Sequence, residues 1–297
     1  MVPVNRNRAV LGRSLLNIDS RGNEYLLRPR ESMSDAELFT LNGNSWGEPY
    51  GATKLMWLND HDPELYERTD WFLHWGSFVS FMLGTEPRVD YSLANRTLFF
   101  DLNRNGWSPE LIKLCGLDQA RIPETVPSGT VIGSVSKDAA KAHGVPAGTS
   151  IVSGAHDQCA NATGCGAIYD GTALCGMGAF PTIAPVYSMP RPPEAMLALG
   201  LNTEHHAAPG LFVSFIFHMG GSFVKWYRDL PSGPSGGEGR ASYDELFAGL
   251  TERSSVLQAI VEGNACALDL VFDRLPEAEI EPESTRAKRS HTARRSN

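Results

Sequence analysis

The 297-residue sequence contains no uninterrupted apolar stretch of the ~18 to 20 residues that a membrane-spanning helix requires. Its first residues, MVPVNRNRAVLGRS, also lack the apolar core of a secretory signal. These two absences predict a soluble, cytoplasmic protein with no membrane partner. A hydrophobic content of 42% is sufficient for a sizeable core, and the length allows about two domains.

Several chemical signatures are absent as well. The five cysteines are an odd number and form no CxxC pair, so we expect neither a disulfide framework nor a zinc site. The net charge of -8 argues against a nucleic-acid partner, because a phosphate-binding face usually appears as a basic stripe. The sequence also has no GxxxxGK phosphate loop.

Basic residues are concentrated at the C-terminus. The segment TRAKRSHTARRSN contains no acid and directly follows the acidic PEAEIEPES. An abrupt change of charge without apolar periodicity is typical of disorder. We therefore predict a disordered, charged tail over residues 276–297.

Apolar spacing along the rest of the chain predicts mixed strands and helices, and so an α/β fold. The expected elements are short strands within residues 1–30, helices within 51–84, a helix N-capped by Ser108 with Pro109 in its first turn, a helix ended by Gly144, a strand at 150–153, a hairpin within 171–187, a helix from about Gly221 and an amphipathic helix over 254–275.

The strand at 150–153 leads directly into the polar triplet His156, Asp157 and Gln158. A carboxylate at the end of a strand is held rigidly and is open to a cleft, so Asp157 could act as a general base toward a hydroxyl. Aspartate is also a favoured N-cap, and a helix is expected to begin here, so capping is an equally supported alternative. A metal site at His156 and Asp157 is disfavoured, because adjacent strand residues point to opposite faces.

Other side chains that could carry chemistry are expected to be structural. The glycines of GMGAF, residues 176–180, could present backbone N–H groups to a phosphate, but most such bends are hairpin turns. The histidines of EHH at 204–206 and His218 are expected to be satisfied structural residues. The tryptophans at helical spacing, Trp57, Trp71 and Trp75, are expected to lie in the core.

Taken in order, these segments resemble the FGGY family of carbohydrate kinases. LLNIDSRGNE is similar to the family's Trp-x-Asp-x-Arg segment, with Asn17 in place of Trp and with Asp19 and Arg21 retained. DYSLANRTLFFDLNRNGWSPELIKLCGLD resembles the Asp-Tyr-Ser-x-Ala-Ser block. The strand ending in SGAHDQ resembles the one that carries the catalytic aspartate, with Asp157 at that position.

The resemblance implies an actin-like (ribonuclease H-like) ATPase fold with two domains and a cleft between them. Residues 1–165 would form a partial N-terminal domain on the sugar side, with the catalytic aspartate at its end. Residues 166–275 would form a partial C-terminal domain on the nucleotide side, followed by the charged tail. Both domains are expected to be incomplete.

The chemistry implied by the resemblance is transfer of the γ-phosphoryl group of ATP to a hydroxyl of a small sugar or polyol. Asp157 would take the hydroxyl proton, and Mg²⁺ would offset the phosphate charge. The resemblance also implies substrate contacts for three further residues and nucleotide contacts for three residues of the hairpin. These are Gln158, Asp19 and Arg21 for the substrate, and Gly176, Gly178 and Ala179 for ATP.

The sequence also departs from the family pattern. No Asp-x-Gly-Thr phosphate loop or Gln-x-x-Gly sugar loop precedes the matching segments, and the hairpin has Gly178-Ala179 where Gly-Thr is usual. An internal segment and the Gly-Gly-x-x-Ser adenine region are also missing. Unpaired strand edges left by such losses would favour a homodimer or aggregation.

Three hypotheses about function follow. The chain is an active carbohydrate kinase, or it is a catalytically inactive remnant or sugar-binding module. The third hypothesis is an intact enzyme whose gene model is truncated.

Overall fold

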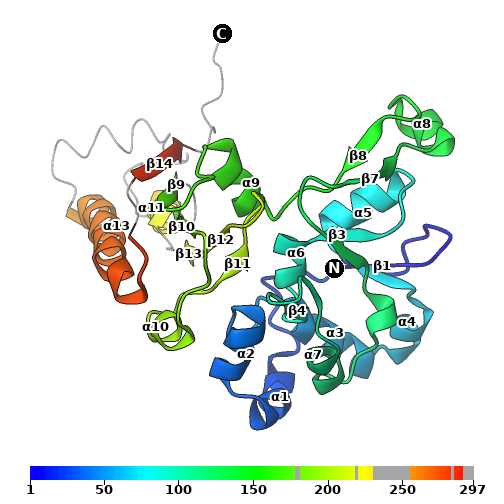
Figure 1. The fold of residues 1–297 in the computed structure, drawn as a ribbon, viewed down its shortest axis with the longest axis horizontal. Coiled ribbons are helices and arrows are strands. Elements are labelled where there is room, and N and C mark those ends of the chain that lie inside the picture. The colour runs from blue at the N-terminus through cyan, green and yellow to red at the C-terminus, as the bar shows by residue number, and fades with distance from the viewer. Residues whose placement is uncertain (178–180, 218–219, 230–254, 282–283, 290–297) are drawn as a thin grey trace.

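The computed structural model describes residues 1–177, 181–217, 220–229, 255–281 and 284–289. Figure 1 shows two groups of elements that meet along one side. We call residues 1–156 the first lobe and the described residues from 157 onward the second lobe. The α9 helix, Asp157–Gly164, packs in the second lobe, since Cys159 and Ala162 share a core cluster with Leu174 of that lobe. The predicted domain boundary lies after this helix, at residue 165.

The first lobe is built from helices and short strands. In chain order these are β1 (Val2–Val4), η1 (Asn23–Leu26), α1 (Leu27–Ser32), α2 (Asp35–Asn42), α3 (Gly51–His61), α4 (Pro63–Arg68), β2 (Trp71–Leu73), α5 (Trp75–Met82), β3 (Arg88–Asp90), α6 (Tyr91–Asn95), β4 (Phe100–Asp101), β5 (Gly106–Trp107), α7 (Pro109–Leu114), η2 (Gln119–Arg121), β6 (Glu124–Val126), β7 (Val131–Ser134), α8 (Lys137–His143) and β8 (Ser150–Val152).

The strands of this fully described lobe pair in twos. β1 pairs antiparallel with β2, and β3 pairs parallel with β6. β4 pairs antiparallel with β5, and β7 with β8. The largest core of the lobe therefore lies among its helices, where Leu38, Leu98 and Leu111 are fully buried.

Local sequence signals determine several helix ends. Ser108 caps α7 by accepting a hydrogen bond from the Leu111 N–H, and Pro109 is the first residue of the helix, as predicted. Gly144 ends α8 in the left-handed conformation with φ of 72°, which is also as predicted. Ser34 and Glu37 form a capping box at the start of α2.

The prediction of several strands within residues 1–30 is wrong beyond β1. Residues 5–22 contain turns and a single bridge between Val4 and Val10, followed by η1. Leu15 packs against the main core of the lobe without joining a strand ladder. An alternating apolar pattern predicted strands here, but Leu16 and Ile18 are exposed, so the apolar side chains do not form one buried strand face.

The second lobe contains the larger sheet. Its elements are α9, β9 (Thr172–Met177), β10 (Thr182–Tyr187), α10 (Pro193–Ala198), β11 (Glu204–His205), β12 (Phe212–Val213), β13 (Ile216–Phe217), α11 (Gly220–Arg228), α13 (Ser255–Arg274), η4 (Leu275–Ala278) and β14 (Ser284–Arg289). The strand order is β11-β12-β10-β9-β14, and β13 also pairs with β10. The predicted hairpin is confirmed as the antiparallel pair β9 and β10, and its bend at 178–180 lies outside the described residues.

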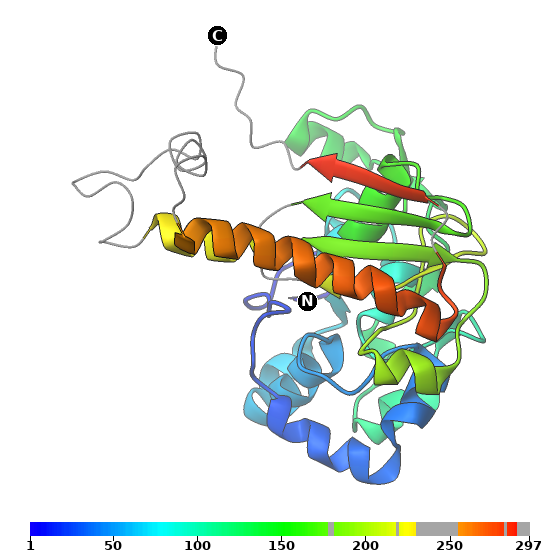
Figure 2. The ribbon, with the colours of Figure 1, turned by 90° about the vertical axis from the view of Figure 1, so that its left-hand side faces the viewer.

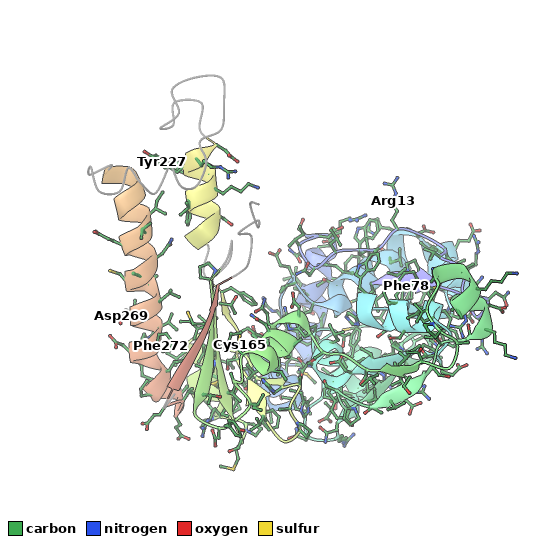
Figure 3. All side chains as sticks on the ribbon, turned by 90° about the horizontal axis from the view of Figure 1, so that it is seen from above. Arg13, Phe78, Cys165, Tyr227, Asp269 and Phe272 are labelled. Atoms are coloured by element: carbon green, nitrogen blue, oxygen red, sulfur yellow. The ribbon has the colours of Figure 1, made fainter. Side chains whose placement is uncertain are left out.

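Two helices cover this sheet. Figure 2 shows α13 lying across one face, and Phe272 near its end packs with Tyr187 of β10. The α11 helix lies beside α13 (Figure 3), where Val224 packs with Tyr227 and Ile260. Gly220 permits this approach, because a Cβ atom there would lie 2.7 Å from Asn264 Nδ2. Both helices agree with the predicted segments.

The prediction of disorder over 276–297 is wrong for part of that range. Ala278 and Ile280 are buried, and Ser284–Arg289 form β14, which pairs parallel with β9. Strand pairing is made by backbone groups, so an open edge can accept a strand whatever the charge of its side chains. Residues 290–297 lie outside the described residues. None of the helices in the described ranges is long and apolar enough to cross a membrane.

Candidate functional site

A cavity of about 420 Å³ opens beside the point where the chain passes from the first lobe to the second. This volume is within the range of small-molecule sites, roughly 300–1,000 Å³. Its lining is formed by Met1, Leu15, Leu16, Asn17, Pro49, Tyr50, Gly51, Lys54, His74, Trp75, Gly76, Leu93, Arg96, Ala155, His156 and Asp157.

Asp157 lies in this lining as the first residue of α9. Its side chain is 81% exposed, and its Oδ1 atom accepts a hydrogen bond from the Gln158 backbone N–H at 2.8 Å. The N-cap of α9 is His156, so the alternative in which Asp157 serves as the N-cap is wrong. A carboxylate in the first turn still interacts favourably with the helix dipole.

His156 connects this carboxylate to the first lobe. Its Nε2 atom lies 3.1 Å from Asp157 Oδ1, and its backbone N–H donates to Ser92 Oγ at 2.7 Å. The two side chains meet because the residues occupy the N-cap and first turn of a helix, whereas the sequence interpretation placed them on opposite faces of a strand. Burial lowers the pKa of His156. No group of three or more His, Cys, Asp or Glu in the part of the chain that the structure describes could hold a metal ion.

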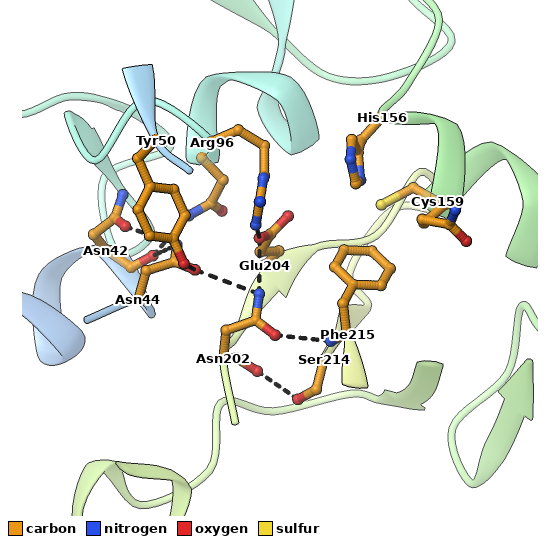
Figure 4. A network of polar contacts seen from close by, with 12 residues as sticks. Asn42, Asn44, Tyr50, Arg96, His156, Cys159, Asn202, Glu204, Ser214 and Phe215 are labelled. Carbon is orange, nitrogen blue, oxygen red and sulfur yellow. Dashed lines mark hydrogen bonds and ion pairs between the residues drawn. The ribbon is translucent and has the colours of Figure 1, made fainter. Parts of the chain in front are cut away.

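A buried ion pair joins the two lobes next to the cavity. Arg96 Nη1 of the first lobe lies 2.5 Å from Glu204 Oε1 of the second, and Asn202 Nδ2 donates to the same oxygen at 2.8 Å (Figure 4). Burial acts to lower the pKa of Arg96, but the charge of Glu204, the hydrogen bond to it and the nearby Tyr50 together outweigh burial, so that the net direction is upward. Arg96 therefore stays charged where it contacts the cavity.

The Tyr50 side chain is held by hydrogen bonds that run through two amide side chains, those of Asn44 and Asn42. The Arg96 guanidinium lies over the Tyr50 ring, 4.8 Å from its centroid. The Tyr50 hydroxyl donates to Asn44 Oδ1 at 2.9 Å, and Asn44 Nδ2 donates to Asn42 Oδ1 at 2.8 Å. Burial raises the pKa of Tyr50 to about 12, so that its hydroxyl remains a hydrogen-bond donor.

Lys54 supplies a second buried cation to the lining. Its Nζ atom donates to the Glu48 carbonyl at 2.5 Å and to Thr53 Oγ1 at 3.1 Å. Burial is the largest cause of a lowered pKa for this amine. Lys54 and Arg96 thus add two buried cationic donors to the lining of the cavity.

Asp19 and Arg21 do not line the cavity, although Asn17, two residues earlier, does. Arg21 Nε donates to Asp19 Oδ1 at 2.9 Å, and the guanidinium lies 4.5 Å from the centroid of the Trp57 ring. The hydrogen bond from Arg21 lowers the pKa of Asp19 to about 2. The two side chains thus satisfy each other.

The remaining predicted site residues lie apart from the cavity lining. Gln158 contacts Asp157 through its backbone N–H, and its side chain does not line the cavity. Gly176 is on β9 opposite Thr182 of β10 and does not line the cavity. Gly178 and Ala179 lie outside the described residues.

Sequence reasoning missed Tyr50, Lys54 and Arg96 as residues of the cavity. It also placed Trp75 in the core, whereas this side chain is 56% exposed and lines the cavity. One signal was present, because Arg96 stands among apolar residues in LANRTLFF, and a charge in such a setting is buried and needs a partner.

The EHH histidines pack as structural side chains, but they are not fully satisfied, because Nε2 of both His205 and His206 is buried without a hydrogen-bond partner among the described residues. The ring of His205 packs against Phe100 and Phe212, and His206 Nδ1 accepts a hydrogen bond from the Ala208 N–H at 2.8 Å. Burial lowers the pKa of both histidines to about 4. His218 lies outside the described residues.

Comparison with known proteins relates the chain to sugar kinases. The family described as "FGGY family of carbohydrate kinases, N-terminal domain" matches residues 1–164. The chain is 28% identical over 178 residues to xylulose kinase of Bacillus subtilis (strain 168), covering 60% of the chain and 36% of that relative. It is 31% identical over 125 residues to L-fuculokinase of Salmonella typhi, covering 42% of the chain and 26% of that relative. The chain thus spans well under half the length of these relatives.

Solved structures show the same fold. Xylulose kinase from Rhodospirillum rubrum superposes with a TM-score of 0.72 at 24% identity, covering 86% of this chain and 51% of that structure. Glycerol kinase from Plasmodium falciparum with ADP gives a TM-score of 0.77 at 18% identity, covering 99% of this chain and 66% of that structure. The described residues therefore have a mixed α/β fold that matches part of these kinases.

Proposed function

Because the chain belongs to the FGGY family of carbohydrate kinases, we propose that it carries the sugar side of such an enzyme. In this proposal Asp157 takes the proton of a sugar or polyol hydroxyl as that hydroxyl attacks the γ-phosphorus of ATP. The observation that supports it best is the position of Asp157, whose exposed carboxylate lines a cavity of about 420 Å³.

The lining of the cavity suits a polyhydroxylated ligand. Lys54 and Arg96 add buried cationic donors to the lining, Tyr50 adds a buried hydroxyl oxygen, and Trp75 adds an exposed aromatic ring. Small-molecule sites are mostly apolar, with a few fixed polar groups that orient the ligand. The Arg96 guanidinium, held by Glu204, would meet a sugar hydroxyl oxygen without further ordering, and the Tyr50 oxygen, whose proton is bonded to Asn44, could accept from a sugar hydroxyl.

Three further residues are proposed as substrate contacts on the basis of the family resemblance. Gln158 directly follows Asp157 on α9, and Asp19 and Arg21 follow Asn17 of the cavity lining. Asp19 and Arg21 would have to exchange part of their mutual hydrogen bonding for contacts with the substrate. They are thus weaker candidates than the residues that line the cavity.

ATP is the proposed phosphoryl donor, with Gly176, Gly178 and Ala179 of the hairpin as its contacts. The described ranges contain no cluster of His, Cys, Asp or Glu that could hold Mg²⁺, and Gly176 is not part of the cavity lining. The described residues therefore do not build a metal site, and we assign no step to a protein-bound metal. Mg²⁺ would have to arrive with the nucleotide.

A second candidate is a module that binds a sugar without transferring phosphate. This candidate is favoured by the position of Gly176, the one described residue among the three proposed nucleotide contacts, which does not line the cavity. Both candidates need the same cavity, but they differ in what happens when ATP is added.

Ligand binding and ADP formation together separate the two. The full chain would be titrated with glycerol, xylulose, L-fuculose and gluconate, and its unfolding midpoint followed by differential scanning fluorimetry. A ligand at 100 times its Kd stabilises the folded state by about 2.7 kcal/mol. If the chain is the proposed kinase, at least one ligand raises its unfolding midpoint, and ADP is formed from ATP only when that ligand is present. Binding without ADP formation favours the module, and no binding of any ligand contradicts both.

A further inference from the structure

The two oxygens of the Asp157 carboxylate lie in different surroundings. Oδ1 accepts the hydrogen bond from the Gln158 backbone N–H at 2.8 Å and lies 3.1 Å from His156 Nε2. Oδ2 has no hydrogen bond or ion pair to any residue within the described ranges. One oxygen is therefore occupied by the protein, and the other is free to meet a substrate.

His156 is anchored far more firmly than the carboxylate that it touches. Its side chain is 17% exposed, and its ring packs edge-on against Phe215 with the centroids 5.2 Å apart (Figure 4). Its backbone N–H donates to Ser92 Oγ, and Ser92 in turn bonds to the buried Asp90. The backbone of His156 is thus tied to α6, and its ring packs beside β13, next to Asp157.

The surroundings of His156 determine which ring nitrogen carries a proton. Burial lowers its pKa, the charges of Glu204, Asp157 and Asp90 act to raise it, and Arg96 acts to lower it. His156 also interacts electrostatically with His74, and the Cys159 side chain lies near the ring (Figure 4). The net direction is downward, so that the ring is neutral at pH 7 with a single N–H. Because a carboxylate only accepts, that proton belongs on Nε2, and Nδ1 is buried without a partner in the described structure.

We infer that His156 is a positioning residue for Asp157. Together with the Gln158 N–H it holds Oδ1 and leaves Oδ2 as the oxygen that accepts the substrate proton. This inference rests on the proposed function and deepens it. The substrate O–H bond breaks, its proton bonds to Oδ2, and the electron pair left on the substrate oxygen forms the new bond to the γ-phosphorus while ADP leaves with the electrons of the broken P–O bond.

The contact itself can be tested without turnover. Histidine side chains of the full chain, labelled with ¹⁵N, are titrated by NMR in wild type, D157N and the control D138N. Asp138 is also an exposed first-turn aspartate, on α8. We expect the neutral ring of His156 to carry its proton on Nε2, and its pKa to fall in D157N, since the neighbouring negative charge is lost, but to stay unchanged in D138N. A proton on Nδ1, or the same pKa in all three proteins, would overturn the inference.

The role in positioning is tested by two substitutions of different chemistry. In H156Q an amide nitrogen can replace Nε2, whereas H156L keeps the bulk and removes the donor. Loss of alignment can cost up to about 100-fold in rate. We expect H156L to lower kcat by up to that factor with little change in the KM for the sugar, and H156Q to recover most of the loss. Equal losses in both folded variants, or a change confined to KM, would overturn the role.

The two arms also separate this inference from the proposed function. If wild type forms no ADP with any sugar, the proposed function fails, and the NMR titration still decides whether His156 holds Asp157. If ADP is formed but the titration shows no coupling, the kinase function stands and the positioning role of His156 is wrong.

Discussion

Two acidic side chains near the cavity lie in opposite settings. Glu204 is fully buried and pairs with Arg96, whose side chain is 16% exposed, so that the pair joins the two lobes. Asp157 is 81% exposed and has one oxygen without a partner in the described structure. A buried charge interacts strongly with its partner because the surrounding dielectric is low, whereas an exposed charge interacts weakly. The difference indicates that Glu204 serves the fold and that Asp157 is available for chemistry.

The largest change in stability is expected for Glu204→Ala, which removes the carboxylate of the buried ion pair. The substitution leaves the Arg96 guanidinium buried without its carboxylate, which typically costs about 3–5 kcal/mol. We expect the free energy of unfolding, measured by urea titration, to fall by this amount. The control is Glu64→Ala, which removes an exposed i,i+4 pair with Arg68 and should change the same quantity by less than about 0.5 kcal/mol. Equal effects would show that the pair between the lobes adds no special stability.

The buried histidines should make the stability of the fold depend on pH. Burial lowers the pKa of His206 from 6.5 to about 4, so the unfolded chain binds more protons than the folded one between these values. Stability should therefore fall as the pH falls from 6.5 to 4, by up to about 3 kcal/mol for this residue.

The variant His206→Asn keeps an acceptor for the Ala208 N–H and removes the titrating ring. We expect its unfolding free energy to fall less steeply with pH over this range than that of wild type. An unchanged slope in His206→Asn would contradict the assignment.

A local hydrogen bond on the surface should have a smaller effect. In Ser34→Ala, α2 loses the hydroxyl that accepts from the Glu37 N–H in the capping box. The expected loss is about 1 kcal/mol of unfolding free energy. Ser80→Ala removes a hydroxyl that only donates back to the Gly76 carbonyl within α5, and we expect it to stay within about 0.5 kcal/mol of wild type. Thermal unfolding of the two variants side by side measures the difference.

The exposed pair of Asp19 and Arg21 should have the smallest effect. Replacing Asp19 by Asn removes a surface ion pair, for which measured values are about 0.2–1 kcal/mol. The pKa of Asp19 is lowered to about 2 by Arg21, so this contribution is present above pH 4 and is lost as the pH falls toward 2. Urea titration of wild type and Asp19→Asn at a series of pH values should show a difference in the free energy of unfolding above pH 4 that shrinks as the pH falls toward 2.

Local signals in the sequence predicted much of the fold. The cap at Ser108, the stop at Gly144 and the hairpin of β9 and β10 each depend on residues close together in the chain. The β14 strand was missed because its pairing with β9 depends on an open edge formed elsewhere. The change of charge along residues 276–297 therefore led to the wrong expectation of disorder for β14.

The site was predicted less completely than the fold. The position of Asp157 at the end of a strand was visible in the sequence, and the structure places it in the cavity lining. The ion pair of Arg96 and Glu204 joins residues 108 positions apart, and no local pattern specifies such a contact. Asp19 and Arg21 were predicted as substrate residues from the family segment, but their mutual pairing, two residues apart, satisfies both side chains outside the cavity lining.

Asp157 is proposed as the base of a sugar-phosphorylating site. The measurement that tests this role is the rate of sugar-dependent ADP formation by Asp157→Asn compared with wild type. A general base contributes about 10²–10⁴-fold to rate. We predict a loss of this size with an unchanged unfolding midpoint and an unchanged Kd for the sugar, while the matched Asp138→Asn keeps the wild-type rate. An Asp157→Asn protein that forms ADP as fast as wild type would show that Asp157 is not the general base.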